Sequence, residues 1–456
     1  MHAVFAEDPA TALPVHILKS DKLEAWLEGR GEALRALVSA MNFSASAGQN
    51  LIVPAPDGQI ERVLFGVGDG SDPLIVAALS AALPEGVYKI ASAPSDMPAS
   101  TIAAAWADGA YRFTRYKADA GAPPQLAPME GMDLAEASAQ TEAVDLVRDL
   151  VNTPAADMGP TEIEAAARGL AAEHRASIEV IKGDQLLDAG YPMVHAVGRA
   201  AADAPRYIEL NWGRKKSPRI AIVGKGVSFD TGGLNIKTGG FMRLMKKDMG
   251  GAAHALALAK LVMASGLDVN LCVAIPTVEN AIGAGAFRPG DILTARNGLT
   301  VEVEDTDAEG RLILADALSR VSEQDPELVI DFATLTGAAR VAMGAEVAPF
   351  FTDNDELAAD ISQASEEIGD PAWRLPMWAP YASQLSSPIA DLKNLGDGPL
   401  GGSIMAALFL KNFVVAPAWV HWDVWAWRPA KFGRPQGAVA NGLRAMHRML
   451  KRRYRN

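Results

Sequence analysis

Cysteine is nearly absent from this chain of 456 residues, and the single Cys272 excludes an internal disulfide. We therefore expect the protein to work in a reducing compartment. Long apolar runs are also missing, and residues 1–26 lack the basic start and continuous apolar core of a signal peptide. These absences predict a cytoplasmic protein that does not enter a membrane.

Positive charge is in short supply, because 42 lysines and arginines face 55 aspartates and glutamates and leave a net charge of −13. Broad nucleic-acid binding needs a basic face, and docking on anionic lipid needs basic clusters, so neither is expected. Hydrophobic residues make up 49% and charged residues 21% of the chain, a globular composition that excludes a disordered protein.

Several common catalytic signatures are absent as well. The sequence contains no HExxH zinc motif, no Walker loop and no GxSxG nucleophile elbow, and its seven histidines are scattered. The Gly-rich segment 66–71 lacks the third glycine of a dinucleotide loop at the required spacing. These absences exclude the commonest histidine-based, phosphate-binding and serine-hydrolase sites.

The first third of the chain predicts a smaller α/β domain. Residues 62–68 have the pattern of a strand and residues 99–116 that of a helix. A Pro-, Gly- and Ala-rich stretch at 117–133 is typical of a linker, and a helix is expected over 134–151. We therefore predict an N-terminal α/β domain at residues 1–135 and a larger domain at residues 136–456.

From about residue 219 apolar strands alternate with helices. Strands are expected at 219–224, 269–276, 299–304 and 327–335, and helices at 250–265 and 311–323. This alternation predicts an α/β domain with a mostly parallel central sheet. Sites in such sheets form in the loops beyond the carboxyl ends of the strands.

Two segments at predicted strand ends, 223–251 and 303–318, combine charged residues with glycines. They contain four carboxylates and three cations, namely Asp230, Asp248, Asp307, Glu309, Lys225, Lys237 and Arg311. Four converging carboxylates cannot all ionise without compensation, and two divalent cations would balance their charge. Oxygen ligands suit magnesium or manganese, and zinc accepts carboxylate together with a nitrogen donor. Taken singly, acidic residues in Gly-rich loops are more often caps and turn formers.

These segments resemble signatures of the leucyl (cytosol) aminopeptidase family of dinuclear metallopeptidases. Residues 305–312 read DTDAEGRL, where the family has NTDAEGRL, and residues 224–251 follow its GKG…FDSGG…IK…DMGG pattern with Thr231 in place of serine. Further matches lie at 151–160, 331–338, 389–394 and 401–414. The resemblance runs from about residue 140 to the C-terminus, whereas residues 1–135 resemble the variable N-terminal domain only in position.

The resemblance implies a role for each residue. One metal would be held by Lys225, Asp230, Asp248 and Glu309, and a second, more exchangeable metal by Asp230, Asp307 and Glu309. The catalytic residues would be Lys237 and Arg311. A lysine ligates a metal only as the neutral amine, so Lys225 would lose its proton, whereas Lys237 would stay charged and polarise the scissile carbonyl.

The resemblance further implies a bicarbonate at Arg311, which is expected to open the helix 311–323. It also implies a homohexamer, zinc or manganese as the metals, and peptides with a free N-terminus as substrates. The activity would be release of the N-terminal residue by attack of a metal-activated water. The alternative is a catalytically silent scaffold that binds a partner or nucleic acid, but such a member is expected to have lost at least one of the seven site residues.

The sequence departs from the family pattern at two places. Asp305 replaces asparagine, which predicts a preference for a basic first residue, a shifted pKa of a metal ligand, or a shielded loop carboxylate without effect on the reaction. Trp425-Ala426 replaces Ala-Gly, so the pocket for the substrate's first side chain is either reshaped or Trp425 packs in the core. By resemblance the remaining pocket residues are Met245, Thr334 and Gly337.

Overall fold

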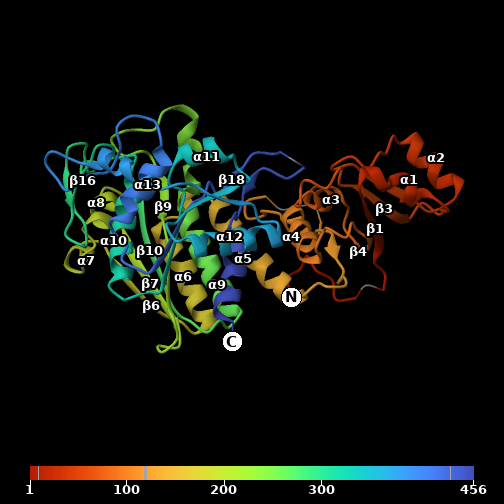
Figure 1. Cartoon of the computed structure of the whole chain (residues 1–456), viewed down its shortest axis with the longest axis horizontal. Helices are drawn as coiled ribbons and strands as arrows, with labels where there is room; N and C mark the ends of the chain where they lie inside the picture. Colours follow the sequence, from red (N-terminus) through yellow and green to blue (C-terminus); the bar gives the residue numbers. More distant parts are fainter. Residues whose placement is uncertain (9, 118–120, 432, 456) are drawn as a thin grey trace. The chain divides into compact units, whose positions relative to one another are not determined.

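A computed structural model describes residues 1–8, 10–117, 121–431 and 433–455 (Figure 1). It divides into two compact units, one of Met1–Asp145 with Pro429–Gly437 and one of Leu146–Arg428 with Ala438–Asn456. The domain boundary predicted between residues 135 and 136 falls inside helix α5 (Leu134–Asn152) and stays a prediction. No helix of the described ranges has the length and apolar character required to cross a bilayer.

The first unit is a five-stranded α/β fold with strand order β2-β3-β1-β4-β5. Its strands are β1 (Leu13–Leu18), β2 (Asn50–Pro54), β3 (Ile60–Gly66), β4 (Val87–Ser92) and β5 (Gln125–Leu126). Its helices are η1 (Ser20–Lys22), α1 (Leu23–Leu27), α2 (Glu32–Ala40), α3 (Val76–Ala82), α4 (Ala99–Ala110) and the start of α5. Strands β3, β1, β4 and β5 run parallel, and β2 is antiparallel to β3. Tyr88 and Trp106 are fully buried in its core.

The sequence-based expectations for this unit hold with two differences. The predicted strand at 62–68 is β3, but the helix predicted for 99–116 ends at Ala110. The segment expected to be a linker, 117–133, contains β5, which pairs with β4; residues 118–120 lie outside the described residues. A two-residue edge strand leaves almost no periodic signal, which explains why composition alone indicated a linker.

The second unit is built on a sheet with the order β15-β14-β17-β13-β8-β10-β7-β6, and β9 pairs with β10. The central strands β17, β13, β8 and β10 run parallel. They span Ala418–Asp423, Leu328–Ala333, Arg219–Gly224 and Asn270–Asn280. The other strands are β6 (Ser177–Lys182), β7 (Arg206–Gly213), β9 (Gly226–Asp230), β14 (Ala348–Phe351) and β15 (Ala372–Arg374).

Short strands lie outside this sheet: β11 (Ile292–Thr294), β12 (Thr300–Glu302), β16 (Leu392–Lys393), β18 (Trp427–Arg428) and β19 (Gly437–Ala438). The helices are η2 (Ala155–Asp157), α6 (Pro160–His174), α7 (Gln185–Asp188), α8 (Pro192–Gly198), η3 (Gly239–Met249), α9 (Gly250–Ala264), α10 (Glu309–Ser322), α11 (Gly337–Met343), α12 (Asp355–Ile368), η4 (Ala379–Leu385), α13 (Gly402–Lys411) and α14 (Leu443–Tyr454).

Helices cover both faces of the large sheet. In Figure 1, α8, α10 and α13 lie on one side of the strands and α6 and α9 on the other. Strand β8 is buried along almost its whole length, as expected for a parallel strand with helices on both faces. Helix α9 is apolar on nearly all sides and is buried accordingly.

The predicted α/β class with a mostly parallel central sheet is therefore confirmed, and the strand at 219–224 and the helix at 250–265 lie where the sequence places them. One detail is wrong: α10 begins at Glu309, so Arg311 is its third residue and does not open it. A carboxylate in the first turn suits the positive end of the helix dipole better than arginine does.

Candidate metal centre and active site

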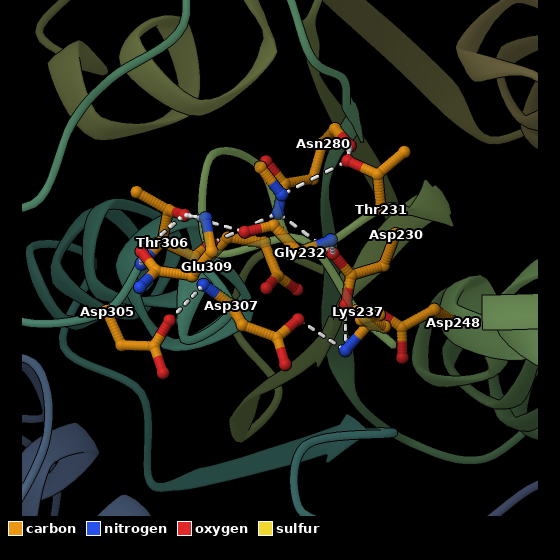
Figure 2. A network of polar contacts seen from close by, with 12 residues as sticks. Asp230, Thr231, Gly232, Lys237, Asp248, Asn280, Asp305, Thr306, Asp307 and Glu309 are labelled. Atoms are coloured by element: carbon orange, nitrogen blue, oxygen red, sulfur yellow. Dashed lines mark hydrogen bonds and ion pairs between the residues drawn. The ribbon is translucent and has the colours of Figure 1, made fainter. Parts of the chain in front are cut away.

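The two acidic segments meet at the carboxyl end of the central parallel strands (Figure 2). Lys225 directly follows β8, and Asp230 ends β9. Asp248 lies in η3, which leads into α9, and Glu309 begins α10. Four elements, β8, β9, η3 and α10, begin or end here, so residues that are up to 84 positions apart can face one another.

Asp230, Asp307 and Glu309 form the tightest cluster, because each offers one carboxylate oxygen within 4.8 Å of those of the other two. Asp248 is connected to this cluster through Lys225. The Lys225 Nζ atom lies 2.7 Å from Asp248 Oδ2 and 3.1 Å from Glu309 Oε1. All five residues predicted as metal ligands are thus brought together.

Lys237 lies on the more open side of the cluster. Its Nζ atom is 2.8 Å from Asp230 Oδ2 and also pairs with Asp307. Burial lowers the pKa of Lys237, but the surrounding carboxylates, Asp230 first, outweigh burial and raise the pKa overall. The pKa of Lys225 is raised in the same way, chiefly by Asp248 and Glu309. The two lysines are therefore ammonium ions that balance part of the negative charge.

The carboxylates still carry more negative charge than their surroundings accommodate. Burial, followed by repulsion from Asp230, raises the pKa of Asp307 to about 7 and that of Glu309 to about 8. Asp248 Oδ2, Asp307 Oδ1 and Glu309 Oε1 are buried and have only lysine ammonium groups as partners, and Glu309 Oε2 is buried with no hydrogen-bond partner in the described part of the chain. Buried oxygens without such partners are costly, and hard divalent cations are the partners that they fit.

Glycines allow the elements around the centre to approach one another closely. A Cβ on Gly310 would lie 2.4 Å from Lys225 Cε, and a Cβ on Gly251 would lie 2.2 Å from the carbonyl oxygen of Phe332. Larger residues at these two positions would push α10 and α9 away from the strand ends. Steric crowding thus explains why glycine stands at these two positions of the acidic segments.

A hydrogen-bond network joins the two ligand-bearing loops (Figure 2). Asn280, the last residue of β10, donates from Nδ2 to Asp230 Oδ1 at 2.8 Å and to the Thr306 carbonyl at 3.1 Å. Thr306 Oγ1 donates to the Gly232 carbonyl at 2.6 Å and accepts from the Asn235 backbone at 2.9 Å. These bonds fix the position of Asp230 relative to the loop that carries Asp307.

Asp305 is used inside its own loop. Its Oδ1 atom accepts a hydrogen bond from the Asp307 backbone N–H at 2.8 Å (Figure 2). Asn394 supports the same loop, because its side chain accepts from the Asp305 N–H at 3.2 Å and donates to the Asp305 carbonyl at 2.7 Å. An asparagine at 305 would accept the same bond from Asp307 through its Oδ1, which explains how either residue fits the position.

Arg311 lies in the first turn of α10 and is 5% exposed. Its Nη1 atom donates to the Asn394 carbonyl at 2.7 Å, whereas its Nε has no hydrogen-bond partner among the described residues. Burial lowers the Arg311 pKa to about 10, which leaves it charged at neutral pH. The guanidinium thus retains a free donor beside the carboxylate cluster.

Of the four remaining predicted pocket residues, Thr334 contacts Asp248 directly. Thr334, just after β13, donates from Oγ1 to Asp248 Oδ1 at 2.9 Å. Met245 is buried in η3, three residues before Asp248, and Gly337 is an exposed residue at the start of α11. Trp425 is half-buried, so it is neither a full core residue nor fully open to solvent.

Ala426 occupies the position where the family pattern has glycine. Its φ angle is +55°, in the left-handed region that favours glycine, and a side chain there costs roughly 1 kcal/mol. A Cβ on Gly250 would lie 2.6 Å from Ala426 Cβ, so the extra methyl is accommodated against a glycine.

Some residues of the site escaped sequence reasoning. Asn280 ends β10, which runs four residues beyond the strand predicted at 269–276, so the strand-end rule pointed to this edge of the sheet but not to Asn280 itself. Asn394 lies in the matched segment 389–394, but nothing in the sequence indicated its two bonds to the 305 loop. Lys247 and Arg340, which both lie over the Trp425 ring, had no signal.

The fold and the site together define a metal-dependent enzyme of the α/β class. A family model described as "Cytosol aminopeptidase family, catalytic domain" matches residues 145–447, and one described as "M17 aminopeptidase, N-terminal domain" matches residues 13–127. The chain belongs to the cytosol aminopeptidase family and is a metal-dependent aminopeptidase. The second match also shows that the N-terminal residues resemble the family in sequence as well as in position.

Individual relatives agree with this assignment. A probable cytosol aminopeptidase from a Synechococcus species is 38% identical over 438 residues, which cover 91% of this chain and 90% of the relative. A crystal structure of a cytosol aminopeptidase from Coxiella burnetii is 40% identical, with a TM-score of 0.92, and the match covers 98% of this chain and 99% of that one. The bottromycin maturation enzyme BotP in complex with Mn is 32% identical, with a TM-score of 0.86 and coverage of 97% and 99%.

Proposed function

We propose that this aminopeptidase uses two divalent metal ions, zinc or manganese. The observation that carries the proposal is the buried carboxylate cluster at Asp248, Asp307 and Glu309, in which Glu309 Oε2 has no hydrogen-bond partner among the described residues and three further oxygens have only lysine ammonium groups as partners. We assign one ion to Lys225, Asp230, Asp248 and Glu309, and the other to Asp230, Asp307 and Glu309. Manganese in the complex of BotP supports metals of this size and charge.

When bound, the metals would supply the Lewis acidity that activates water for attack on a peptide carbonyl. Asp248, which is fixed by Thr334, would bind the free α-amino group of the substrate and so limit cleavage to the first residue. Lys237, on the open side of the cluster, would hydrogen-bond the carbonyl oxygen as negative charge develops on it. Lys225 would deprotonate when cations replace the positive charge that it now provides.

We also propose that Arg311 binds a bicarbonate anion. Its buried guanidinium has an Nε donor without a partner among the described residues, and it lies at the positive end of α10. A buried, charged donor of this kind fits a small planar anion.

The proposed setting is the cytoplasm, with peptides as substrates and a homohexamer as the assembly. The names of the relatives and the buried, unpaired Cys272 support the cytoplasm. The hexamer rests on the family resemblance, and it predicts a sedimentation mass about six times the 48.1 kDa of one chain. The net charge of −13 argues against nucleic acid and anionic membranes as partners, because both are negatively charged.

The test is hydrolysis of aminoacyl amides and dipeptides by protein stripped with a chelator and then reloaded with manganese or zinc. Activity should disappear on stripping, return on reloading, and be restricted to substrates with a free N-terminus. Calorimetry should find two ions per chain. Lys237→Ala should lose activity but keep metal binding, because Lys237 is assigned no ligand role. Binding of one ion, or full activity of Lys237→Ala, contradicts the assignment.

A further inference from the structure

Arg340 carries a charge that its surroundings do not balance. It lies in α11 and is half-buried, yet it makes no ion pair with any carboxylate that the structure describes. Its Nε atom is buried and has no hydrogen-bond partner among the same residues. Most other half-buried arginines of the chain are paired; Arg296, for example, lies 2.7 Å from Glu323. A guanidinium left in this state attracts an anion from outside the chain.

Arg340 is held in place by an aromatic ring shared with a second cation. Its Cζ atom lies 4.4 Å from the centroid of the Trp425 ring, and Lys247 Nζ lies 4.1 Å from the same centroid. Both distances are within the range of cation–π attraction. Two positive charges therefore converge on one indole ring. We name Lys247, Trp425 and Arg340 the cationic wall.

The cationic wall adjoins the carboxylate cluster. Lys247 Nζ is 3.6 Å from Asp248 Oδ1, which also accepts a hydrogen bond from Thr334. Thr334 begins the loop that leads to α11, and Arg340 is one helical turn beyond Gly337 on the same face of that helix. Gly337 is exposed, and a Cβ there would meet no atom within 4 Å, so space is open at this end of the wall.

The position of the cationic wall beside the metal centre determines which part of a bound substrate contacts it. An aminopeptidase holds the first residue of its substrate at the metal centre, so the side chain of that residue projects from there. Asp248 partly neutralises Lys247, but it is also engaged by Lys225 and Thr334 and is assigned to a metal, so the positive charge of Arg340 in the wall stays unbalanced. The nearby Asp305, whose negative charge predicted a basic first residue as one possibility, has its Oδ1 bonded to the Asp307 backbone.

We propose that the cationic wall selects substrates whose first residue has an acidic side chain and disfavours those that begin with lysine or arginine. Arg340 would pair with the substrate carboxylate, and the Trp425 ring would hold the Arg340 guanidinium in position. This inference rests on the proposed function, because it requires the first residue to lie at the centre assigned above.

The experiment compares kcat/KM for the dipeptides Glu-Ala, Leu-Ala and Lys-Ala with the manganese-loaded enzyme. We expect Glu-Ala to be cleaved at least tenfold faster than Lys-Ala, and this preference to shrink as salt is raised. Arg340→Gln should lower the Glu-Ala to Leu-Ala ratio about tenfold, mainly through KM, and Arg340→Lys should recover part of it. The control Arg35→Gln removes an exposed arginine from α2 and should leave every ratio unchanged.

Each outcome has a distinct meaning. The cationic wall is not a selector if Leu-Ala is cleaved and the Glu-Ala to Leu-Ala ratio of kcat/KM is unchanged in Arg340→Gln. The same holds if Lys-Ala is cleaved as fast as Glu-Ala. Either outcome leaves the proposed function intact. Cleavage of none of the dipeptides by enzyme that binds two metal ions overturns the proposed function, and the inference with it. A melting temperature of Arg340→Gln within about 2 °C of the wild type shows that a changed ratio does not come from unfolding.

Discussion

Gly310 shows how strongly the size of one residue controls the metal centre. It is the second residue of α10, between the carboxylate of Glu309 and the guanidinium of Arg311. Its missing side chain leaves the space that the Lys225 chain occupies. A motif that reads as a string of charged residues therefore depends equally on a residue with no side chain.

We predict that Gly310→Ala displaces Lys225 without unfolding the protein. The added Cβ would lie 2.4 Å from Lys225 Cε, while alanine in place of glycine favours the helix by up to about 1 kcal/mol. Activity and manganese affinity should each fall at least tenfold, as measured by dipeptide hydrolysis and calorimetry. The matched control is Gly169→Ala in α6, where a Cβ meets no atom within 4 Å, and it should change neither. Unchanged manganese affinity in Gly310→Ala would contradict the steric role.

Single positions also show where sequence reasoning stops. The seven charged residues could be identified because they lie in long, specific motifs at strand ends, and the structure brings them together. The role of Asp305 could not be decided, because the sequence does not show whether its carboxylate faces substrate or the backbone of Asp307. Arg340 carried no signal at all, since its significance lies in the absence of an ion-pair partner among the described residues.

At the scale of helices and strands, prediction succeeded where a pattern is long and periodic. The strand at β8 and the helix at α9 have continuous apolar stretches and were located within one or two residues. Prediction failed at short elements such as β5 and at the ends of elements, such as the C-terminal end of the helix predicted for 99–116. Short strands form through pairing with distant neighbours, and a local sequence window does not contain those neighbours.

Strand β10 contributes to the site through its last residue. Asn280 binds Asp230 and the Thr306 carbonyl with one amide group, so it connects the ends of two elements that each carry metal ligands. We predict that Asn280→Ala lowers manganese affinity about tenfold, a typical effect of removing a residue that orients a ligand. Calorimetry of the apoenzyme gives this affinity independently of catalysis.

A control is available on the same strand. Asn270 lies at the opposite end of β10, away from the carboxylates, and Asn270→Ala should leave manganese affinity unchanged. Equal affinities in Asn280→Ala and the wild type would show that Asp230 holds its position without this amide. A fall in melting temperature with unchanged affinity would assign Asn280 to stability alone.

At the scale of the whole molecule, we expect acid stability to depend on buried histidines that lie outside the carboxylate cluster. His447 of α14 is 1% exposed, and its Nε2 lies 2.9 Å from Ser265 Oγ just after α9. Its Nδ1 atom is buried without a hydrogen-bond partner in the described ranges. Burial, reinforced by Lys451 and Arg448, lowers the His447 pKa from 6.5 to about 3. The imidazole is therefore neutral in the folded protein throughout the physiological range.

The sign of the pH effect follows from that difference. Below pH 6.5 the histidine takes up a proton in the unfolded chain but not in the folded one, so stability is lost as the pH falls from 6.5 toward 3. At pH 4.5 the loss amounts to roughly 3 kcal/mol for this one group.

We predict a smaller fall in melting temperature between pH 7 and pH 4.5 for His447→Gln than for the wild type. Glutamine can keep a hydrogen bond to Ser265 but does not titrate. His195→Gln, at a half-buried position in α8, is the control and should follow the wild type. Parallel pH profiles for all three proteins would mean that His447 becomes protonated in the folded state, and the acid sensitivity of the molecule would then have to arise elsewhere, first at His254 in α9, whose pKa burial lowers to about 4.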